Sequence, residues 1–367
     1  MKRIVHIITD LDSGGAENML LKFLRYSDKE EYFHEVISLK DEGVIGEKII
    51  KEGIKVHCLN LHKSNFISSF NRAVKICKNF DIINTWLYHA DIFGFILSKV
   101  MLRKKLIWNI RHSNLDKEAN KKSTLRIVKT NSLISKYVDC ITYNSNKALE
   151  THQEIGYKNN HSVIIPNGFE LDRYKFNIKK RVAIRKKLMI KDNEKVIITV
   201  GRWDIQKDYY TLMKALNELK VNKTDYKVIM VGTKLDEYNE ELVSLIKKYN
   251  LEENIILLGR RDDIVELLSA ADLYVSSSMG ESFSNAIGEA MACELTCIVT
   301  NVGDSKLMVA NSGIVVEKQD YLKMAAQIGN FIKQPKSERN KVARKRVLEN
   351  YEIRTVVKNI EGNIFRF

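Results

Sequence analysis

Proline is scarce in this sequence, with 2 among 367 residues, and no internal repeat or low-complexity tract interrupts a composition that is 44% hydrophobic. A chain this apolar is not intrinsically disordered, and its length is too great for one ordinary hydrophobic core. We therefore expect two globular domains.

Cysteine is also sparse, and its count of five is odd. The spacing makes no disulfide framework, and the two cysteines that lie four residues apart, Cys293 and Cys297, have no nearby histidine to complete a zinc site. These features predict a reducing compartment and no metal.

Long hydrophobic runs are missing as well. The apolar run 4–9 is too short for a signal peptide and stops at Asp10. No segment approaches the roughly 20 apolar residues that span a bilayer. We expect a cytoplasmic protein.

Acidic residues are outnumbered, since 60 Lys and Arg against 46 Asp and Glu give a net charge of +14. This excess predicts a polyanionic partner, such as anionic lipid, nucleic acid or a phosphorylated substrate. It is concentrated in residues 99–129, where ten basic residues accompany only Asp116 and Glu118. The ten are Lys99, Arg103, Lys104, Lys105, Arg111, Lys117, Lys121, Lys122, Arg126 and Lys129.

Apolar residues within and after this stretch suit a helix that rests on anionic headgroups, and a solvated helix face fits the pattern equally well. They are Leu125, Ile127, Val128, Leu133, Ile134 and Val138. We expect peripheral association with the inner face of a membrane. Nucleic acid is not expected, because the chain has no zinc finger, no RRM-like signature and no basic stripe with stacking aromatics.

Short aliphatic and β-branched runs alternate with longer amphipathic stretches in both halves, which predicts an α/β fold with parallel sheets. The expected strands of the first half are 4–9, 34–38, 55–59, 82–85, 106–110 and 140–144. Those of the second half are 196–201, 227–232, 255–258, 273–276, 296–300 and 313–316. Each set suffices for a doubly wound, Rossmann-like domain.

The expected domain boundaries follow from the breaks in this alternation. We place the first domain at 1–168, a linker rich in Lys and Arg at 169–187, and the second domain at 188–350. The segment 351–367 has apolar residues at helical spacing and should dock elsewhere. Ligands of such sheets bind at the carboxyl ends of the strands, so we expect the site in a cleft between the two sheets.

The richest motif is the segment 276–292, which leaves an expected strand, turns at Gly280 and opens a helix. Free N–H groups at that helix start favour a phosphate. Glu281 precedes this anion site and Glu289 lies beyond it, an arrangement that a nucleotide sugar needs for the hydroxyls at its two ends. From spacing alone, two ordinary surface glutamates are the more frequent explanation.

A second motif, Gly201-Arg202-Trp203-Asp204-Ile205-Gln206-Lys207, directly follows the first strand of the second half. Arg202 and Lys207 can reach one dianion from this loop and replace a metal. They would neutralise the charge that develops on a departing diphosphate. Exposed loop cations are the alternative.

The first half offers weaker signals. Gly14 and Gly15 allow backbone N–H groups to approach a phosphate or sugar, without the three-glycine dinucleotide pattern. The pair Asp10 and Asp12 can also be read as metal ligands, which we do not favour because two cations already serve the same charge.

Strand-end residues of the first half supply candidates for the acceptor side. His112 follows an expected strand and would face the cleft, although a lone histidine is more often structural. The other candidates on this side are Trp86, Tyr88, His89, Asn144 and Ser145.

Together, these segments resemble the successive motifs of the retaining glycosyltransferases of family GT4, which have the GT-B fold. The resemblance rests on Val163-Ile164-Ile165-Pro166-Asn167-Gly168, on Val200-Gly201-Arg202 with Lys207, and on Glu281 to Glu289 followed by Ala290-Met291-Ala292. The Gly14-Gly15-Ala16-Glu17 start and the segment 299–305 resemble the bacterial polysaccharide-building members of this family.

The resemblance implies roles for individual residues. Glu281 would bind hydroxyls of the donor sugar, Glu289 the ribose, and Arg202 and Lys207 the diphosphate, while His112 would lie near the exocyclic end of the sugar. The remaining donor-side candidates are Ser282, Phe283, Ser284, Asn285, Gly14, Gly15 and Arg261. Members of the family need no metal, and their last helix crosses back to the first domain. Retention is ascribed to front-face attack.

The sequence departs from the family pattern at four places. Glu170 replaces a usual Asp, Glu294 and Asp208 replace usual glycines, and Gly232-Thr233-Lys234 lacks a second glycine. These changes affect loops and leave the charged candidates in place.

The sequence therefore predicts a metal-independent retaining glycosyltransferase that moves a hexose or hexosamine from a nucleotide diphosphate, most simply UDP, to a lipid-linked glycan. The alternatives are an epimerase or phosphorylase of the same fold, and a non-enzymatic basic protein that binds membrane or nucleic acid.

Overall fold

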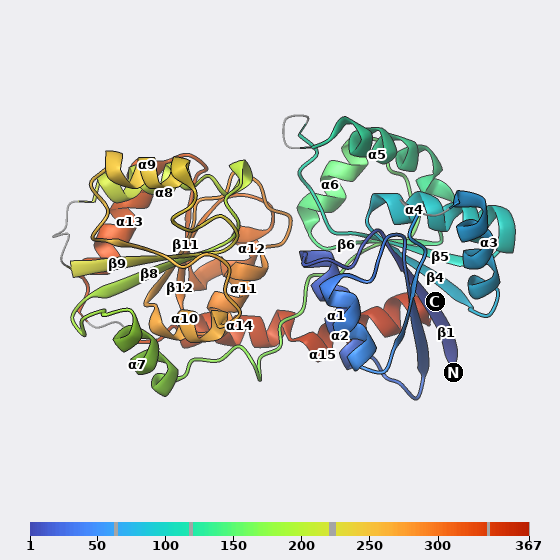
Figure 1. Ribbon diagram of the computed structural model, residues 1–367, viewed down its shortest axis with the longest axis horizontal. Helices are drawn as coiled ribbons and strands as arrows, with labels where there is room; N and C mark the ends of the chain where they lie inside the picture. The colour runs from blue at the N-terminus through green and yellow to red at the C-terminus, as the bar shows by residue number, and fades with distance from the viewer. Residues whose placement is uncertain (62–64, 117–119, 220–224, 336–337, 367) are drawn as a thin grey trace. The chain divides into compact units, whose positions relative to one another are not determined.

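The computed structural model of the protein describes residues 1–61, 65–116, 120–219, 225–335 and 338–366 (Figure 1). Lys117 and Glu118 of the basic stretch, and Phe367 of the last segment, lie outside the described residues. The chain divides into two compact units. Unit 1 comprises Met1–Gly168 and Ile353–Phe367, and unit 2 comprises Phe169–Glu352.

Unit 1 is built on a parallel sheet of order β3-β2-β1-β4-β5-β6-β7. Its strands are β1 (Lys2–Ile8), β2 (Tyr32–Ser38), β3 (Lys55–Cys58), β4 (Ile82–Trp86), β5 (Lys105–Ile110), β6 (Cys140–Tyr143) and β7 (Ser162–Ile164). The last of these, which pairs with β6, was not among the expected strands. Its helical segments are α1 (Gly15–Tyr26), α2 (Gly43–Lys51), α3 (Phe66–Cys77), α4 (Tyr88–Phe95), η1 (Ile96–Leu102), α5 (Lys122–Ile134), η2 (Ser135–Tyr137), α6 (Asn146–Glu154), α15 (Ile353–Ile360) and η6 (Glu361–Phe365).

Unit 2 contains a second parallel sheet, of order β10-β9-β8-β11-β12-β13. Its strands are β8 (Lys195–Val200), β9 (Tyr226–Val231), β10 (Ile255–Leu257), β11 (Leu273–Ser276), β12 (Thr296–Thr300) and β13 (Ile314–Val316). Its helical segments are α7 (Ile178–Lys187), η3 (Ile205–Lys207), α8 (Tyr209–Asn217), α9 (Glu240–Lys248), α10 (Ile264–Ala270), α11 (Asn285–Ala292), α12 (Ser305–Val309), η5 (Ala310–Ser312), α13 (Tyr321–Lys333) and α14 (Lys341–Tyr351). The predicted α/β class with doubly wound parallel sheets is confirmed.

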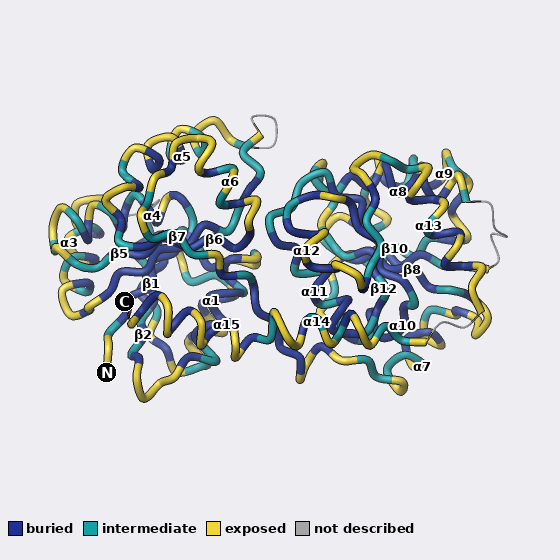
Figure 2. The backbone as a smooth tube through the Cα atoms, turned by 180° about the vertical axis from the view of Figure 1, so that it is seen from behind, coloured by how far each residue is buried: buried dark blue, intermediate teal, exposed yellow. Residues whose placement is uncertain are grey.

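Both faces of each sheet are covered by helices, so the strands run through the buried centre of each unit (Figure 2). Successive side chains of a strand point to opposite faces. In β1, Ile4 and Ile8 pack into one hydrophobic cluster while Val5 and Ile7 pack into another. Burial on both sides explains why these strands read as continuous apolar runs.

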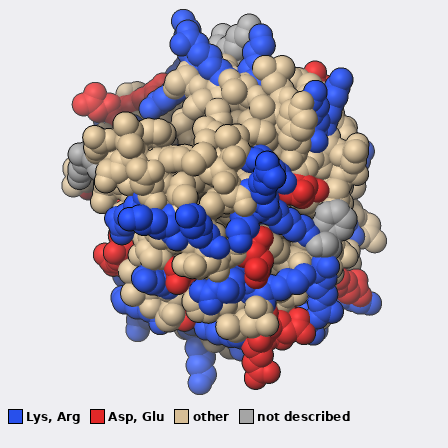
Figure 3. Space-filling view, turned by 90° about the vertical axis from the view of Figure 1, so that its right-hand side faces the viewer, with Lys and Arg blue, Asp and Glu red and all other residues tan. Residues whose placement is uncertain are grey.

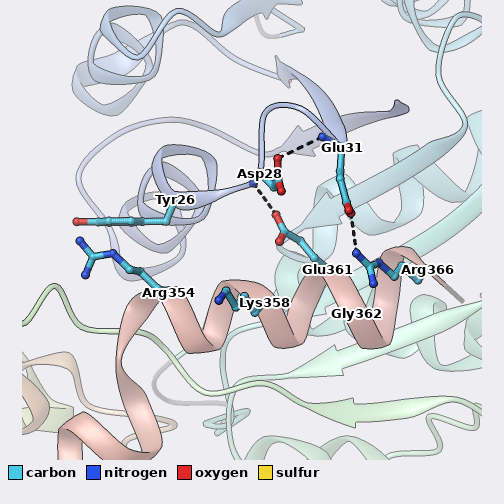
Figure 4. A pocket seen from close by; sticks show the side chains of 8 residues that line it. All are labelled: Tyr26, Asp28, Glu31, Arg354, Lys358, Glu361, Gly362 and Arg366. Carbon is cyan, nitrogen blue, oxygen red and sulfur yellow. Dashed lines mark hydrogen bonds and ion pairs between the residues drawn. The ribbon is translucent and has the colours of Figure 1, made fainter.

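The C-terminal segment is part of unit 1. The carboxylate of Glu361 accepts hydrogen bonds from the Ser27 hydroxyl at 2.6 Å and the Asp28 N–H at 2.9 Å, and Arg366 pairs with Glu31 at 2.7 Å. Figure 4 shows the contacts of Glu361 with Asp28 and of Arg366 with Glu31 at a surface pocket of unit 1. The apolar side chains that were expected to dock are buried in the core of unit 1. They are Val356, Val357, Ile360 and Ile364.

The segment expected as a linker, 169–187, instead belongs to unit 2. Within it, α7 packs on α10. Arg181 and Arg185 both reach the carboxylate of Asp272, at 2.7 and 3.4 Å. Two of the cations that suggest a solvated linker, Arg181 and Arg185, are therefore paired inside the unit.

The basic stretch 99–129 also differs from its expected form. Because α5 packs on α4, the side chain of Val128 is buried, as is that of Val138 beyond the helix. Of the six apolar residues expected to face lipid, only Leu133 is exposed. Among the described residues, we find no helix with the length and hydropathy needed to cross a bilayer.

Candidate functional site

The loop after β8 holds Lys207 in a defined position. The Asp204 carboxylate accepts a hydrogen bond from the Gln206 N–H at 2.9 Å and begins the short helical turn η3. Asp208 follows with a left-handed φ of +45°, and its carboxylate caps α8 by accepting from the Thr211 N–H. A left-handed backbone favours glycine and tolerates Asp, which explains how the sequence departs from the family pattern here.

Lys207 forms an ion pair with Glu281 in the loop after β11. The Ser278 hydroxyl donates to the same carboxylate oxygen at 2.9 Å, and the Ser277 hydroxyl donates to the Lys207 carbonyl at 2.9 Å. Strands β8 and β11 are neighbours in the sheet, so both loops leave its carboxyl edge side by side. The structure thus brings two of the predicted site residues together.

The other two cations predicted for this site have carboxylate partners of their own. Arg202 pairs with Asp204 at 3.0 Å and leaves 67% of its side chain exposed. Arg261 makes a bidentate pair with Asp263, at 2.8 and 2.6 Å.

Helix α11 begins directly after this loop. Its N-cap residue, Ser284, makes no side-chain capping bond, and the first helical residue, Asn285, is partly exposed. The carbonyl of Ser282 accepts from the Asp304 N–H at 3.1 Å, which ties the start of the helix to the loop after β12. Backbone N–H groups at such a helix start can bind an anion.

Phe283 is a core residue. Its ring is stacked on Phe169 with centroids 6.2 Å apart and packs edge-on against Tyr351. Glu289 lies further along α11 and next to Tyr174; burial, and then this carboxylate, raise the pKa of the Tyr174 hydroxyl. Tyr174 is a neighbour of the site that the sequence did not reveal.

In unit 1, Gly14 caps helix α1 and Gly15 is its first residue. A Cβ atom at position 14 would lie 2.1 Å from the carboxylate of Glu17, so a larger residue there would displace the end of this side chain. Burial raises the pKa of Glu17 to about 7; its own N–H opposes this shift, and Asp10 and Asp12 add to it. Glu17 stands in the Gly-Gly-Ala-Glu motif, of which the sequence pattern points only to the glycines.

The alternative in which Asp10 and Asp12 bind a metal finds no further support. Asp10 instead pairs with Lys40 at 3.0 Å. Over the described ranges, no three His, Cys, Asp or Glu side chains gather as metal ligands would.

His112 follows β5 and is partly buried. It lies near His152, whose pKa falls to about 4 because of burial, with a smaller contribution from His112. The preceding residue, Arg111, donates to the Ile165 carbonyl and to the Asn167 side chain, both at 3.2 Å. Burial lowers the pKa of this guanidinium to about 10.

Most of the candidates predicted for the acceptor side are structural in unit 1. Trp86 donates to His6 at 3.3 Å, and the Tyr88 hydroxyl lies 2.9 Å from Nε2 of His152. The Asn144 side chain donates to the Arg111 carbonyl at 3.3 Å, and the Ser145 hydroxyl caps α6 by accepting from the Ala148 N–H. These four residues are buried, whereas His89, the fifth, is exposed.

Two family models match the chain. The model described as glycosyl transferases group 1 matches residues 180–347, and the model described as glycosyltransferase family 4 matches residues 13–173.

Two relatives of the chain are named as glycosyltransferases. The chain is 24% identical to the capsular polysaccharide biosynthesis glycosyltransferase CapH of Staphylococcus aureus, over 83% of each chain. It is 25% identical to an N-acetylgalactosaminyltransferase of Campylobacter jejuni that acts on a diphospho-undecaprenol-linked sugar, over 82% of this chain and 81% of the relative.

Solved structures share the fold. Anabaena HepE, crystallised with UDP-glucose, is 22% identical and superposes with a TM-score of 0.86 over the whole of both chains. The lipopolysaccharide outer core galactosyltransferase WaaB is 14% identical, with a TM-score of 0.74 over 99% of each chain.

Proposed function

Because this chain is a GT4-type glycosyltransferase with the GT-B fold, we propose that it is a retaining, metal-independent enzyme of surface-polysaccharide assembly. Its donor is a UDP-linked hexose or hexosamine. Its acceptor is a hydroxyl of a polyprenyl-diphosphate-linked glycan, bound on the cytoplasmic side of the membrane.

The observation that carries this proposal is the Lys207–Glu281 ion pair at the carboxyl edge of the unit 2 sheet, just before the N-terminus of α11. A cation, a carboxylate and the N–H groups of a helix N-terminus together suit one sugar diphosphate: the carboxylate binds sugar hydroxyls, and the cation and N–H groups bind phosphate oxygens. Arg202, in the same loop as Lys207, is a second cation for the diphosphate.

The proposed reaction breaks the bond between the anomeric carbon and the diphosphate oxygen and forms a bond from that carbon to the acceptor oxygen. The acceptor approaches on the face from which the diphosphate leaves, so the configuration is retained. Its proton passes to the departing phosphate. Lys207 stabilises the negative charge that grows on this leaving group.

The relatives support the choice of donor and acceptor. HepE was crystallised with UDP and with UDP-glucose. A UDP-galactose-dependent galactosyltransferase of Escherichia coli, 31% identical over 43% of this chain, acts on a diphosphoundecaprenol-linked sugar.

The test is to incubate the protein with a panel of nucleotide sugars and a polyprenyl-diphosphate-linked acceptor, with and without a chelator. We expect UDP-sugar-dependent transfer that survives chelation, with the anomeric configuration of the donor in the product. Strict dependence on added Mn²⁺ or Mg²⁺, or an inverted product, would contradict the mechanism. Inorganic phosphate or water as the sole productive acceptor would instead favour a phosphorylase or an epimerase.

A further inference from the structure

Three helical segments of unit 1 end where three adjacent strands begin. The helix α3, the helical segment η1 and the turn η2 end shortly before β4, β5 and β6, which are neighbours in the sheet. Helix α3 also packs on η1, and α4 packs on α5. The segments 75–81, 99–104 and 133–139 therefore lie side by side at the amino edge of the sheet. We call these three segments the amino-edge surface.

The amino-edge surface exposes large apolar side chains, although polar side chains would fit equally well at these helix ends. The exposed fractions are 64% for Val100, 54% for Met101, 69% for Leu133 and 58% for Tyr137. Isolated exposed apolar residues are common in proteins, but four on adjacent segments form a patch.

The same surface is strongly basic. The three segments contain six cations, namely Lys75, Lys78, Lys99, Arg103, Lys104 and Lys136, against two carboxylates. Both carboxylates are engaged: Asp81 accepts from the Arg3 N–H at 2.8 Å, and Asp139 accepts from the Leu106 N–H at 2.6 Å and pairs with Lys99. Figure 3 views the molecule from the side on which α3 lies, and Lys and Arg side chains form bands across this face.

Cations are also favoured at helix C-termini because the backbone carbonyls there are negative. That effect explains some of the lysines but not the apolar side chains between them. Cations that surround exposed aliphatic and aromatic residues match the boundary of an anionic bilayer, where the charges meet phosphates and the apolar groups meet acyl chains. A nucleic acid backbone would leave the aliphatic groups without a partner.

We propose that the amino-edge surface docks the enzyme on an anionic lipid bilayer. Val100, Met101, Leu133 and Tyr137 enter the headgroup boundary, and Lys78, Arg103 and Lys136 contact lipid phosphates. The surface shares residues 99–104 and Leu133 with the region that the sequence suggested, and it adds the segment 75–81 and the exposed ring of Tyr137. The purpose of the docking, access to a lipid-linked acceptor, rests on the proposed function, but its test does not.

The first test reverses charge on the surface in the triple variant Lys78→Glu, Arg103→Glu and Lys136→Glu. The matched control makes the same change in net charge on unit 2, with Lys247→Glu, Lys323→Glu and Lys341→Glu. Binding is measured by sedimentation with vesicles of phosphatidylglycerol and phosphatidylcholine, and with phosphatidylcholine alone. We expect the wild type to bind only the anionic vesicles, the surface variant to bind at least about tenfold more weakly, and the control to lose far less.

A second variant separates lipid insertion from simple charge attraction. Val100→Ser, Met101→Ser and Leu133→Ser leave the charge unchanged, so we expect weaker vesicle binding with unchanged retention on heparin. Three results would overturn the proposal. They are equal loss of vesicle binding in both charge variants, unaltered vesicle binding in the serine variant, and wild-type binding to RNA but not to vesicles. Circular dichroism checks folding.

Two further measurements distinguish a failure of membrane docking from a failure of the proposed function. They are thermal stabilisation by UDP and sugar transfer to a water-soluble acceptor analogue. Both should persist in the charge-reversed variant, because its substitutions are at the amino edge of the unit 1 sheet, whereas Lys207 and Glu281 belong to unit 2. If vesicle binding behaves as expected but no transfer occurs, only the proposed function fails.

Discussion

At the scale of single residues, Lys207 and Glu281 are held by the loops around them before any substrate arrives. Each side chain is mostly buried; the Ser277 hydroxyl donates to the Lys207 carbonyl and so joins the two loops, and the Ser278 hydroxyl donates to the Glu281 carboxylate. Such preorganisation matters because donors and charges that are already in place need not reorganise during the reaction.

We expect Glu281→Gln to reduce sugar transfer by about 100-fold or more, since the variant keeps the shape of the side chain but loses the charge that orients Lys207. Initial rates measure the effect, and a thermal melt shows whether unit 2 remains folded. The control is Glu237→Gln, an exposed glutamate of the same unit. A variant with more than about half of the wild-type rate would remove Glu281 from the site.

Glu17 should make stability depend on pH. Its pKa is about 7 in the folded protein against an ordinary value of 4.5, so between these values the folded state binds more protons than the unfolded state. The free energy of unfolding therefore falls as pH rises through this window and levels off above it. Melting temperatures of wild type and Glu17→Gln at pH 5, 6, 7 and 8 check this, because the variant should lack this part of the decline. Parallel pH curves would contradict it.

Sequence reasoning could place the loops of Lys207 and Glu281 at one edge of the unit 2 sheet, because adjacent parallel strands bring their carboxyl ends together. It failed for Trp86 and Tyr88, which it placed at an open cleft. Their partners, His6 and His152, are distant in sequence, so nothing in the local pattern shows that both side chains are buried.

At the scale of elements, the position of α11 depends on one close contact. A Cβ atom on Gly288 would lie 2.0 Å from Cζ of the Phe169 ring, and Phe169 is fully buried. Helix α11 carries both Glu289 and the candidate anion site, so the contact fixes part of the site.

We expect Gly288→Ala to destabilise unit 2 by about 1–3 kcal/mol, because the ring or the helix must move to admit a methyl group. Chemical denaturation measures the change. The matched control is Gly362→Ala, where a Cβ atom would meet no atom within 4 Å. That change should be neutral or slightly stabilising. Equal stability in the two variants would count against the contact.

The parallel strands were predictable because burial on both faces demands continuous apolar runs. Strand β7 was missed because it is only three residues long and its residues are partly exposed or exposed. Helix α7 was hidden by its basic composition, since pairing of Arg181 and Arg185 with Asp272 is a tertiary feature.

At the scale of the whole molecule, the two units have separate cores, and the C-terminal segment contributes only to that of unit 1. A fully buried aliphatic or aromatic side chain stabilises a fold by roughly 1.5–3 kcal/mol. Several such side chains lie within residues 353–365, which makes their sum comparable to the net stability of about 5–15 kcal/mol that is usual for a domain.

Deletion of residues 353–367 should therefore unfold unit 1 while unit 2 stays folded. Calorimetry should show that one unfolding transition disappears or shifts to a much lower temperature. Limited proteolysis should leave a resistant fragment that begins near Phe169. The control, Glu361→Gln, keeps the apolar contacts and should lower the same transition by only a few degrees. If the deletion leaves both transitions in place, the segment is dispensable for unit 1.

The discontinuity of unit 1 sets an order of events during protein synthesis. The ribosome translates residues 1–168 first, yet the strand-covering helix that completes their core follows only after the whole of Phe169–Glu352 has been made. We expect the nascent chain to hold a sheet with all its strands but with part of its apolar surface uncovered, which chaperones can bind, until the later-made unit has already folded. The unit whose synthesis begins first is thus the last to complete its fold.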